Sequence, residues 1–307
     1  MAMSYPQEIK NTIINLYNEG LSGRKIAKQL GLSKSGVNCV IARYKAGEND
    51  PVIKKHSGAK ILFIDIEVSP SVVLAFSRFK AFSTPDHVLK EPYILTACAK
   101  WAHLDGMMEY ASEYGSDEFV VSELWNLLNE ADVVVAHNAE RFDVGWMNQQ
   151  FVKYDIIPPS PYKVVDTLKI LKKSFSLPSN SLDAACQFFG LERKKQHYGI
   201  DLWNRCMENR WEALDEMLEY NRQDVIILEQ LFNKIQAYAK NMPNMALYYQ
   251  DDGKLRCPHC GSEHFKMEKE LAYTAMSAYN TIRCNDCGKV SRFNSAIKRT
   301  KLVKTIY

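Results

Sequence analysis

The central part of the chain alternates between short apolar runs and longer stretches with a helical period. The apolar runs predict strands at 60–66, 72–79, 93–102 and 132–136, and a shorter one near 163–165. Helical spacing of apolar residues predicts helices at 117–130, 142–153, 181–189 and 211–239. Three early strands with short connections, followed by strands separated by helices, predict an α/β fold with a mixed sheet flanked by helices.

The first predicted strand ends in two acidic residues. Ile61-Leu62-Phe63-Ile64 leads into Asp65-Ile66-Glu67. Residues two apart on a strand point to the same face, so Asp65 and Glu67 should lie side by side. Two carboxylates at the end of a buried strand are costly unless a cation neutralises them. The alternative is a strand that simply reaches solvent.

Residues 6–45 show three short helical patterns, over 6–20, 23–30 and 33–44. In this pattern Ser22 can cap the second helix, and Val37, Val40 and Ile41 face inward on the third. The segment 23–37 resembles a helix-turn-helix of the resolvase or transposase kind. That resemblance implies that the third helix enters the major groove of DNA and presents Lys34, Ser35, Asn38 and Arg43. A small protein-docking module is the alternative.

Charge is distributed unevenly along the 307 residues. Basic residues outnumber acidic ones by nine to four in 1–58 and by eleven to four in 254–307, whereas acidic residues dominate 59–253 by 28 to 19. Two basic ends around an acidic centre indicate an enzyme core with appendages that hold a nucleic acid. We expect domains at 1–46, 59–245 and 246–307, with a turn-rich linker at 47–58.

Two further acidic motifs follow the first one along the chain. They are Asn138-x-x-x-Phe142-Asp143 and Tyr220-x-x-x-Asp224, the second on one face of the long predicted helix. Together with Asp65-x-Glu67 they resemble the three motifs of the DEDD-type 3′–5′ exonucleases, tyrosine subclass. This family has a ribonuclease-H-like fold and includes the proofreading domains of family B DNA polymerases.

The resemblance implies a metal-dependent hydrolysis of phosphodiester bonds with two Mg²⁺ or Mn²⁺ ions. By family analogy Asp65 bridges the two ions, Glu67 and Asp224 hold the first, and Asp143 anchors the second. Tyr220 orients the attacking water, and Asn138 and Phe142 position the terminal nucleotide. These seven residues are the predicted site residues of the core.

Other polar residues of the core have simpler explanations. Asp166 and Asp183 stand at predicted helix starts, where capping accounts for both. The basic stretch Arg193-Lys194-Lys195 is equally compatible with phosphate contacts and with a solvated loop.

Four of the eight cysteines form two pairs near the C-terminus. Cys257-x-x-Cys260 is separated by 23 residues from Cys284-x-x-Cys287, a pattern that resembles a zinc ribbon with one structural Zn²⁺. Two disulfides are the alternative. The tail is too small to bury much apolar surface, so metal binding would supply its folding energy. The other cysteines, Cys39, Cys98, Cys186 and Cys206, have apolar neighbours and are expected to be buried thiols.

These features together predict a DNA 3′–5′ exonuclease with a helix-turn-helix in front and a zinc ribbon behind. The domain combination favours a role in phage or mobile-element DNA processing. No apolar run has the length of a membrane span and no signal-peptide core is present, so a cytoplasmic location and no membrane partner are expected. Two alternatives stay open: an RNA exonuclease with the same site, and a non-catalytic DNA-binding regulator that uses the core as a scaffold.

Overall fold

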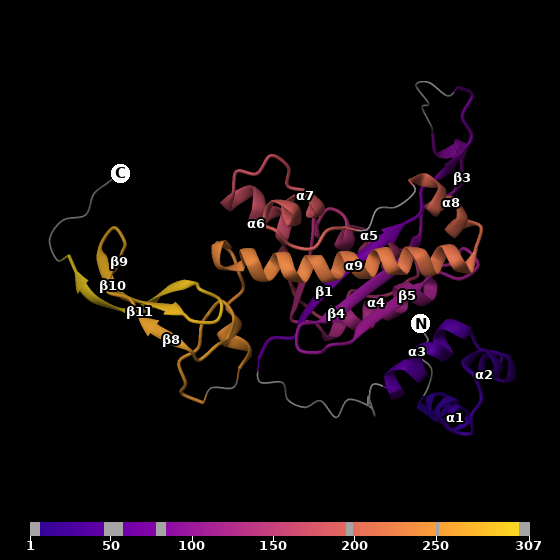
Figure 1. Ribbon diagram of the computed structural model, residues 1–307, viewed down its shortest axis with the longest axis horizontal. Coiled ribbons are helices and arrows are strands. Elements are labelled where there is room, and N and C mark those ends of the chain that lie inside the picture. The colour runs from indigo at the N-terminus through magenta and orange to yellow at the C-terminus, as the bar shows by residue number, and fades with distance from the viewer. Residues whose placement is uncertain (1–6, 46–57, 78–83, 195–198, 250–251, 301–307) are drawn as a thin grey trace.

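The structure is a computed structural model that describes residues 7–45, 58–77, 84–194, 199–249 and 252–300 (Figure 1). The predicted linker 47–58 lies almost entirely outside the described residues. None of the described helices combines the length and the apolar character that a bilayer span requires.

The N-terminal unit consists of the three expected helices, α1 (Gln7–Asn18), α2 (Gly23–Leu30) and α3 (Lys34–Lys45). Ile13, Ile26 and Val37 are fully buried where they meet, because their helical spacing directs one apolar face of each helix inward. Gly31 ends α2 with φ at 66°, a left-handed conformation that glycine adopts without strain. Ser22 occupies the N-cap position of α2, as predicted, but its side chain makes no capping hydrogen bond.

The central sheet is mixed, as predicted, with the strand order β5-β4-β1-β6-β7. Strand β1 pairs antiparallel with β4 and parallel with β6. The outer pairs follow the same pattern, since β4 and β5 are antiparallel and β6 and β7 are parallel. Its strands are β1 (Ile61–Val68), β4 (Ile94–Trp101), β5 (Met107–Ala111), β6 (Val133–Ala136) and β7 (Lys163–Asp166).

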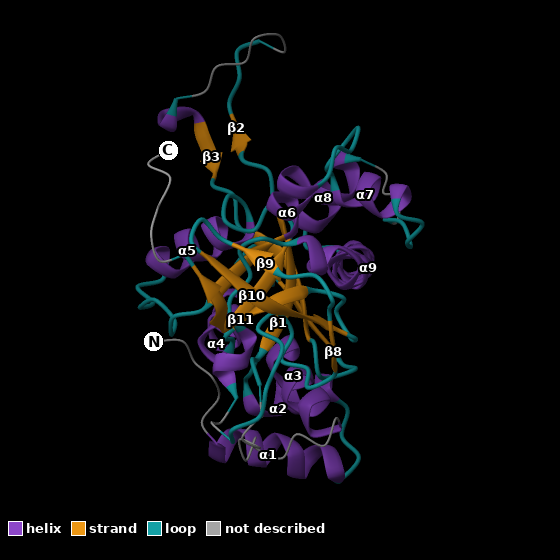
Figure 2. Cartoon of the chain, turned by 90° about the vertical axis from the view of Figure 1, so that its left-hand side faces the viewer, coloured by secondary structure: helices purple, strands orange, loops and turns teal. Residues whose placement is uncertain are grey.

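Strand β1 separates two hydrophobic cores. Leu62, Ile64 and Ile66 pack on the face covered by α4 (Glu118–Glu130) and α5 (Asp143–Lys153). Phe63 packs on the opposite face, under the long helix α9 (Trp211–Ile235). Figure 2 shows α9 end-on at one side of the sheet, with α4 and α5 at the other. Because Asp65 and Glu67 alternate in phase with Phe63, both acids belong to the α9 face.

Helix α9 is fastened to the antiparallel half of the sheet by charged pairs. Arg222 contacts Glu109 of β5 through two hydrogen bonds of 2.5 and 2.8 Å, and Glu229 pairs with Lys100 of β4. Such bidentate pairs fix both distance and orientation. The helix therefore presents a defined face to the end of β1.

Several elements differ from the sequence-based prediction. The expected strand 72–79 is reduced to β2 (Val72–Val73), which pairs with β3 (Val88–Lys90) outside the main sheet, while residues 78 and 79 lie outside the described part. The third antiparallel strand is instead β5, which the prediction missed because Met107–Ala111 lacks strict alternation. Short helices α6 (Thr167–Ser174) and α8 (Ile200–Met207) were also missed, and α7 (Leu182–Phe188) was expected. The described residues also form three 3₁₀ turns, at Pro85–His87, Gln236–Tyr238 and Met245–Tyr248.

The C-terminal unit is a small antiparallel sheet in the order β11-β10-β8, with β9 also paired to β10. Its strands are β8 (Phe265–Met267), β9 (Ala272–Tyr273), β10 (Ser277–Cys284) and β11 (Val290–Arg299). The unit contacts the core where α9 ends, since Lys289 Nζ donates to the carbonyls of Ala237 and Ala239 at 3.0 and 2.7 Å. The boundary at 245/246 stays a prediction.

Candidate active site

Three of the predicted acids converge at the end of β1. One carboxylate oxygen from each of Asp65, Glu67 and Asp224 can be chosen so that all lie within 4.8 Å of one another. The first two come from β1 and the third from α9, 157 positions beyond Glu67 in the sequence. Oxygen ligands at such separations suit a hard divalent cation such as Mg²⁺ or Mn²⁺.

The fourth predicted acid, Asp143, begins helix α5 and is 1% exposed. Neither of its carboxylate oxygens has a hydrogen-bond partner of normal geometry among the described residues. Burial raises the pKa of Asp143 to about 8; the amides of Asp143 and Ile66 oppose the rise, and the charge of Glu67 adds to it. A buried carboxylate whose oxygens make no hydrogen bond of normal geometry fits a group that is completed by a cation.

The remaining acids repel one another. Burial raises the pKa of Asp65 well above its usual value, and the charges of Asp224, Asp143 and Glu67 add to the effect. Burial likewise raises the pKa of Glu67 to about 7, with Lys194 opposing and Asp224 supporting the rise. Burial and neighbouring carboxylates thus disfavour the ionisation of Asp65, Glu67 and Asp143, and a divalent cation would stabilise their charged forms.

Asn138 and Phe142 lie on the connection that leads to Asp143. Asn138 has φ at 67°, a left-handed conformation that asparagine tolerates better than most residues, and its amide donates to Asp166 Oδ1 at 3.0 Å. Phe142 donates its amide to the carbonyl of Asn138, and its side chain is 37% exposed. Asp166 also accepts from the amides of Leu168 and Lys169, so it caps α6 as predicted and holds this turn in place.

The segment that contains most of these elements is similar to a known protein family. Residues 93–236 match the family model RNase_H_2, described as the RNase_H superfamily. The central domain is therefore similar to the RNase_H superfamily over 144 of the 307 residues of the chain. The match includes Asp143, Tyr220 and Asp224 and begins after the strand that carries Asp65 and Glu67.

Curated relatives and a solved structure also show similarity to parts of the chain. The chain is 36% identical over 80 residues to the DNA polymerase III subunit epsilon of Salmonella typhimurium, 35% over 80 residues to that of Escherichia coli and 31% over 87 residues to that of Buchnera aphidicola. These alignments cover 25–27% of this chain, which spans about a third of the length of these relatives. A family B DNA polymerase from Pyrobaculum calidifontis aligns with a TM-score of 0.42 and 15% identity, over 59% of this chain and 25% of that one.

Two polar residues of the central domain join the site without having been assigned to it from sequence. Asn221 is fully buried and donates from Nδ2 to Asp65 Oδ2 at 2.5 Å. It precedes Asp224 by three residues, and this spacing on a helix was the signal that could have identified it. Lys194 reaches Asp224 from a loop, and no local pattern distinguishes it from its neighbours Arg193 and Lys195.

Tyr220 lies beside Asp224 on the same face of α9, as predicted. Its hydroxyl accepts a hydrogen bond of 2.7 Å from Lys194 Nζ. Burial, together with the charge of Asp224, raises the pKa of Tyr220 above its usual value, although Lys194 opposes the shift. The phenol therefore stays protonated at neutral pH and can donate a hydrogen bond, but it is not a base.

The interpretation of Asp183 as a helix cap is wrong. Ser181 caps α7, accepting from the amide of Ala184, while Asp183 binds the loop that follows the helix. Its carboxylate pairs with Arg193 at 2.7 Å and accepts from the amide of Lys194 at 3.2 Å. Sequence spacing could not distinguish these roles, because the partner residues lie ten and eleven positions away.

The predicted DNA contacts of the N-terminal unit are only partly described. Lys34 and Asn38 are exposed on α3. Asn38 also packs closely over the start of α2, since a Cβ at Gly23 would lie 2.0 Å from its Oδ1. Ser35 and Arg43 belong to the same helix, and their side chains lie outside the described part.

The four C-terminal cysteines form a compact cluster. All four sulfurs lie within 4.8 Å of one another, with Cys257 and Cys287 at 3.8 Å and Cys260 and Cys284 at 3.6 Å. These distances exceed a disulfide bond, and the four thiols are free, so the disulfide alternative is wrong for this structure. Tetrahedral Zn²⁺ with Zn–S bonds of about 2.3 Å separates its sulfurs by about 3.8 Å, so the cluster fits this ion.

Proposed function

We propose that this chain is a metal-dependent 3′–5′ exonuclease that hydrolyses DNA by a two-metal mechanism. The observation that carries the proposal is the convergence of Asp65, Glu67 and Asp224 within 4.8 Å, together with the buried Asp143, whose carboxylate oxygens make no hydrogen bond of normal geometry among the described residues. The similarity of part of the chain to DNA polymerase III epsilon subunits supports a nucleic acid, and DNA first, as the substrate.

Each residue of the site has a role that follows from its environment. Asp65, Glu67, Asp224 and Asp143 would hold the catalytic cations, and Asn221 orients Asp65 through its hydrogen bond. Bound Mg²⁺ or Mn²⁺ would lower the pKa of the attacking water and stabilise charge on the phosphate oxygens.

Substrate positioning falls to the polar and aromatic groups around the acids. Tyr220, a neutral phenol, would direct the attacking water by donating a hydrogen bond. Phe142 offers an exposed ring on which the terminal base could stack, and Asn138 holds the turn that presents it. Both contacts would favour a frayed or single-stranded 3′ end, because a stacked base has to leave the duplex.

The two end units would hold the DNA. Basic residues prevail in both, and phosphate contacts supply most of the affinity of a sequence-tolerant binder. We assign DNA binding to α3, with Lys34, Ser35, Asn38 and Arg43, and a structural Zn²⁺ to the four cysteines. A phage or mobile-element setting agrees with such a combination of units.

The test is a time course on single-stranded DNA and RNA oligonucleotides, labelled at either end, with Mg²⁺ or Mn²⁺. A ladder that shortens from the 3′ end, and that disappears in Asp65→Ala and Asp224→Ala with DNA binding retained, is the expected result. The matched control is Asp155→Ala, because Asp155 lies outside the acidic cluster in the same domain.

Other outcomes would choose between the alternatives. Degradation of RNA in preference to DNA would make this an RNA exonuclease with the same site. DNA binding without turnover under either metal would favour the non-catalytic regulator. Undiminished cleavage by both alanine variants would exclude the assigned metal site.

A further inference from the structure

Lys194 places a positive charge inside the acidic cluster. Its Nζ lies 2.5 Å from Asp224 Oδ2, 2.7 Å from the hydroxyl of Tyr220 and 4.7 Å from the centre of the Tyr220 ring. The same charge lowers the pKa of Asp65 and of Glu67 against the effect of burial. The ammonium group thus acts as a counter-ion for these carboxylates.

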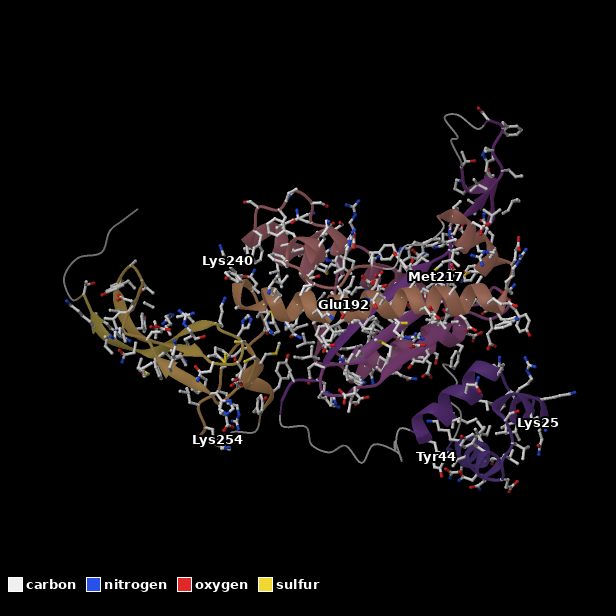
Figure 3. All side chains as sticks on the ribbon, viewed as in Figure 1. Lys25, Tyr44, Glu192, Met217, Lys240 and Lys254 are labelled. Atoms are coloured by element: carbon white, nitrogen blue, oxygen red, sulfur yellow. The ribbon has the colours of Figure 1, made fainter. Side chains whose placement is uncertain are left out.

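The position of Lys194 is built by contacts from two helices. Asp183 of α7 accepts from the backbone amide of Lys194 and pairs with Arg193. Just before them, Glu192 accepts hydrogen bonds from Gln223 and Gln230 of α9, at 3.2 and 3.0 Å. Figure 3 shows Glu192 beside the middle of this helix. The loop is therefore attached to both helices close to Lys194, and the lysine side chain is 30% exposed.

A lysine and a divalent cation cannot share Asp224 without a cost. Mg²⁺ and Mn²⁺ bind carboxylate oxygens at about 2.1 Å, so an ion on the oxygen that Lys194 contacts would lie only a few ångströms from the ammonium. Two cations at that separation repel strongly in a site that is mostly shielded from water. A metal ion on Oδ2 of Asp224 therefore requires Lys194 to move away from that oxygen.

We propose that Lys194 is a tethered cation that competes with the catalytic metal for Asp224 and so sets the metal affinity of the site. This inference rests on the proposed function, since it takes the acidic cluster to be the metal site. The lysine satisfies the carboxylates before metal arrives and raises the metal concentration that the enzyme requires. The role differs from that of a metal ligand, because removing Lys194 should improve metal binding.

The test is calorimetric titration of the full, zinc-loaded chain with Mn²⁺, in the absence of nucleic acid. Lys194→Met should bind Mn²⁺ about tenfold or more tightly than the unaltered chain, because the repulsion between the two cations is removed. The matched control is Lys173→Met, an exposed lysine of α6, which should leave the affinity unchanged. Mn²⁺ binding by Lys194→Met that is equal to or weaker than that of the unaltered chain would overturn the proposal.

A second variant covers the case in which Lys194→Met does not fold. Asp183→Ala keeps the ammonium but releases the backbone of Lys194, so it should raise Mn²⁺ affinity by a smaller factor. An unchanged or lower Mn²⁺ affinity in Asp183→Ala would count against the proposal that Asp183 holds Lys194 in place beside Asp224.

Asp224→Asn separates this inference from the proposed function. Loss of Mn²⁺ binding in Asp224→Asn, together with an unchanged Mn²⁺ affinity in Lys194→Met, would reject the role of Lys194 but not the metal site. Binding by Asp224→Asn that matches the unaltered chain would reject the metal site itself.

Discussion

The side chain of Asn221 donates a hydrogen bond of 2.5 Å to Oδ2 of Asp65 and so joins helix α9 to strand β1 inside the acidic cluster. This contact orients an acid that the proposed mechanism places between two metal ions. Groups that orient metal ligands typically contribute 10- to 100-fold to activity or affinity.

Asn221→Ala should therefore reduce the exonuclease rate by about 10- to 100-fold, because Asp65 loses the partner that fixes its carboxylate. The rate is measured on a single-stranded DNA with saturating Mg²⁺. Asn233→Ala, an exposed asparagine further along α9, is the control and should keep the full rate. A full rate in Asn221→Ala would show that the hydrogen bond has no role in the reaction.

Tyr220→Phe should slow cleavage by about 10- to 100-fold while leaving Mn²⁺ affinity within a factor of about three. The reason is that the neutral phenol would orient water, whereas the acids alone hold the metal. Single-turnover rates and calorimetry measure the two effects separately. Loss of metal affinity in parallel with the rate would instead make Tyr220 a structural support of the site.

Asp143→Asn should stabilise the metal-free protein in a pH-dependent manner. Since the folded pKa of about 8 exceeds the unfolded value, the native state retains a proton that the unfolded state releases between pH 4 and 8. The stability of the unaltered chain therefore falls as pH rises through this window, whereas the side-chain amide of the variant does not titrate there. Denaturant unfolding should show a gain of about 1–3 kcal/mol for the variant at pH 8, and less at pH 5.

Added Mn²⁺ provides the control for this effect. It should stabilise the unaltered chain at pH 8 more than it stabilises Asp143→Asn, because the ion replaces the proton at the carboxylate. A variant advantage that does not vary with pH would point to packing rather than to the buried charge.

Removal of Zn²⁺ should lower the stability of the central domain as well as that of the C-terminal unit. Lys289 lies close to the second cysteine pair and donates hydrogen bonds to the carbonyls of Ala237 and Ala239, where α9 ends. Met245 packs in the core, and its amide donates to the carbonyl of Pro258, which lies within the first cysteine pair. Lys289→Met should lower the melting temperature of the core by about 2–6 °C, since two hydrogen bonds from a charged group are lost.

Calorimetric scans with and without a zinc chelator measure this coupling. Lys266→Met, an exposed lysine of β8, is the control and should melt as the unaltered chain does. A chelated protein whose core melts at the original temperature would show that the two units are energetically independent.

Lys34→Ala should weaken binding to duplex DNA and reduce the slope of log affinity against log salt by about one, as expected for one lost phosphate contact. Cleavage of short single-stranded DNA should not change, because the helical unit is separate from the acidic cluster in the sequence. Lys25→Ala on α2 is the comparison; Figure 3 shows its side chain extending from that helix. Equal losses in both variants would indicate general charge attraction rather than a contact by α3.

The sequence alone determined the features that depend on local spacing. The alternation of Phe63, Asp65 and Glu67 against Ile64 and Ile66 follows from the period of a strand, so the face that bears both acids was predictable. The same holds for the three N-terminal helices, for the mixed sheet and for Tyr220 and Asp224 one turn apart on α9. Elements with weak periodicity, β5, α6 and α8, were missed because packing rather than pattern stabilises them.

Only the tertiary structure decided which of these residues meet. Asp65 and Asp224 are 159 positions apart, and they come together because α9 is held against β4 and β5 by Arg222 and Glu229. The structure also gave Asp183 and Lys194 their roles, since their partners come from other elements and leave no trace in local spacing. Contacts between distant segments depend on how the helices pack on the sheet, and one-dimensional patterns do not contain that information.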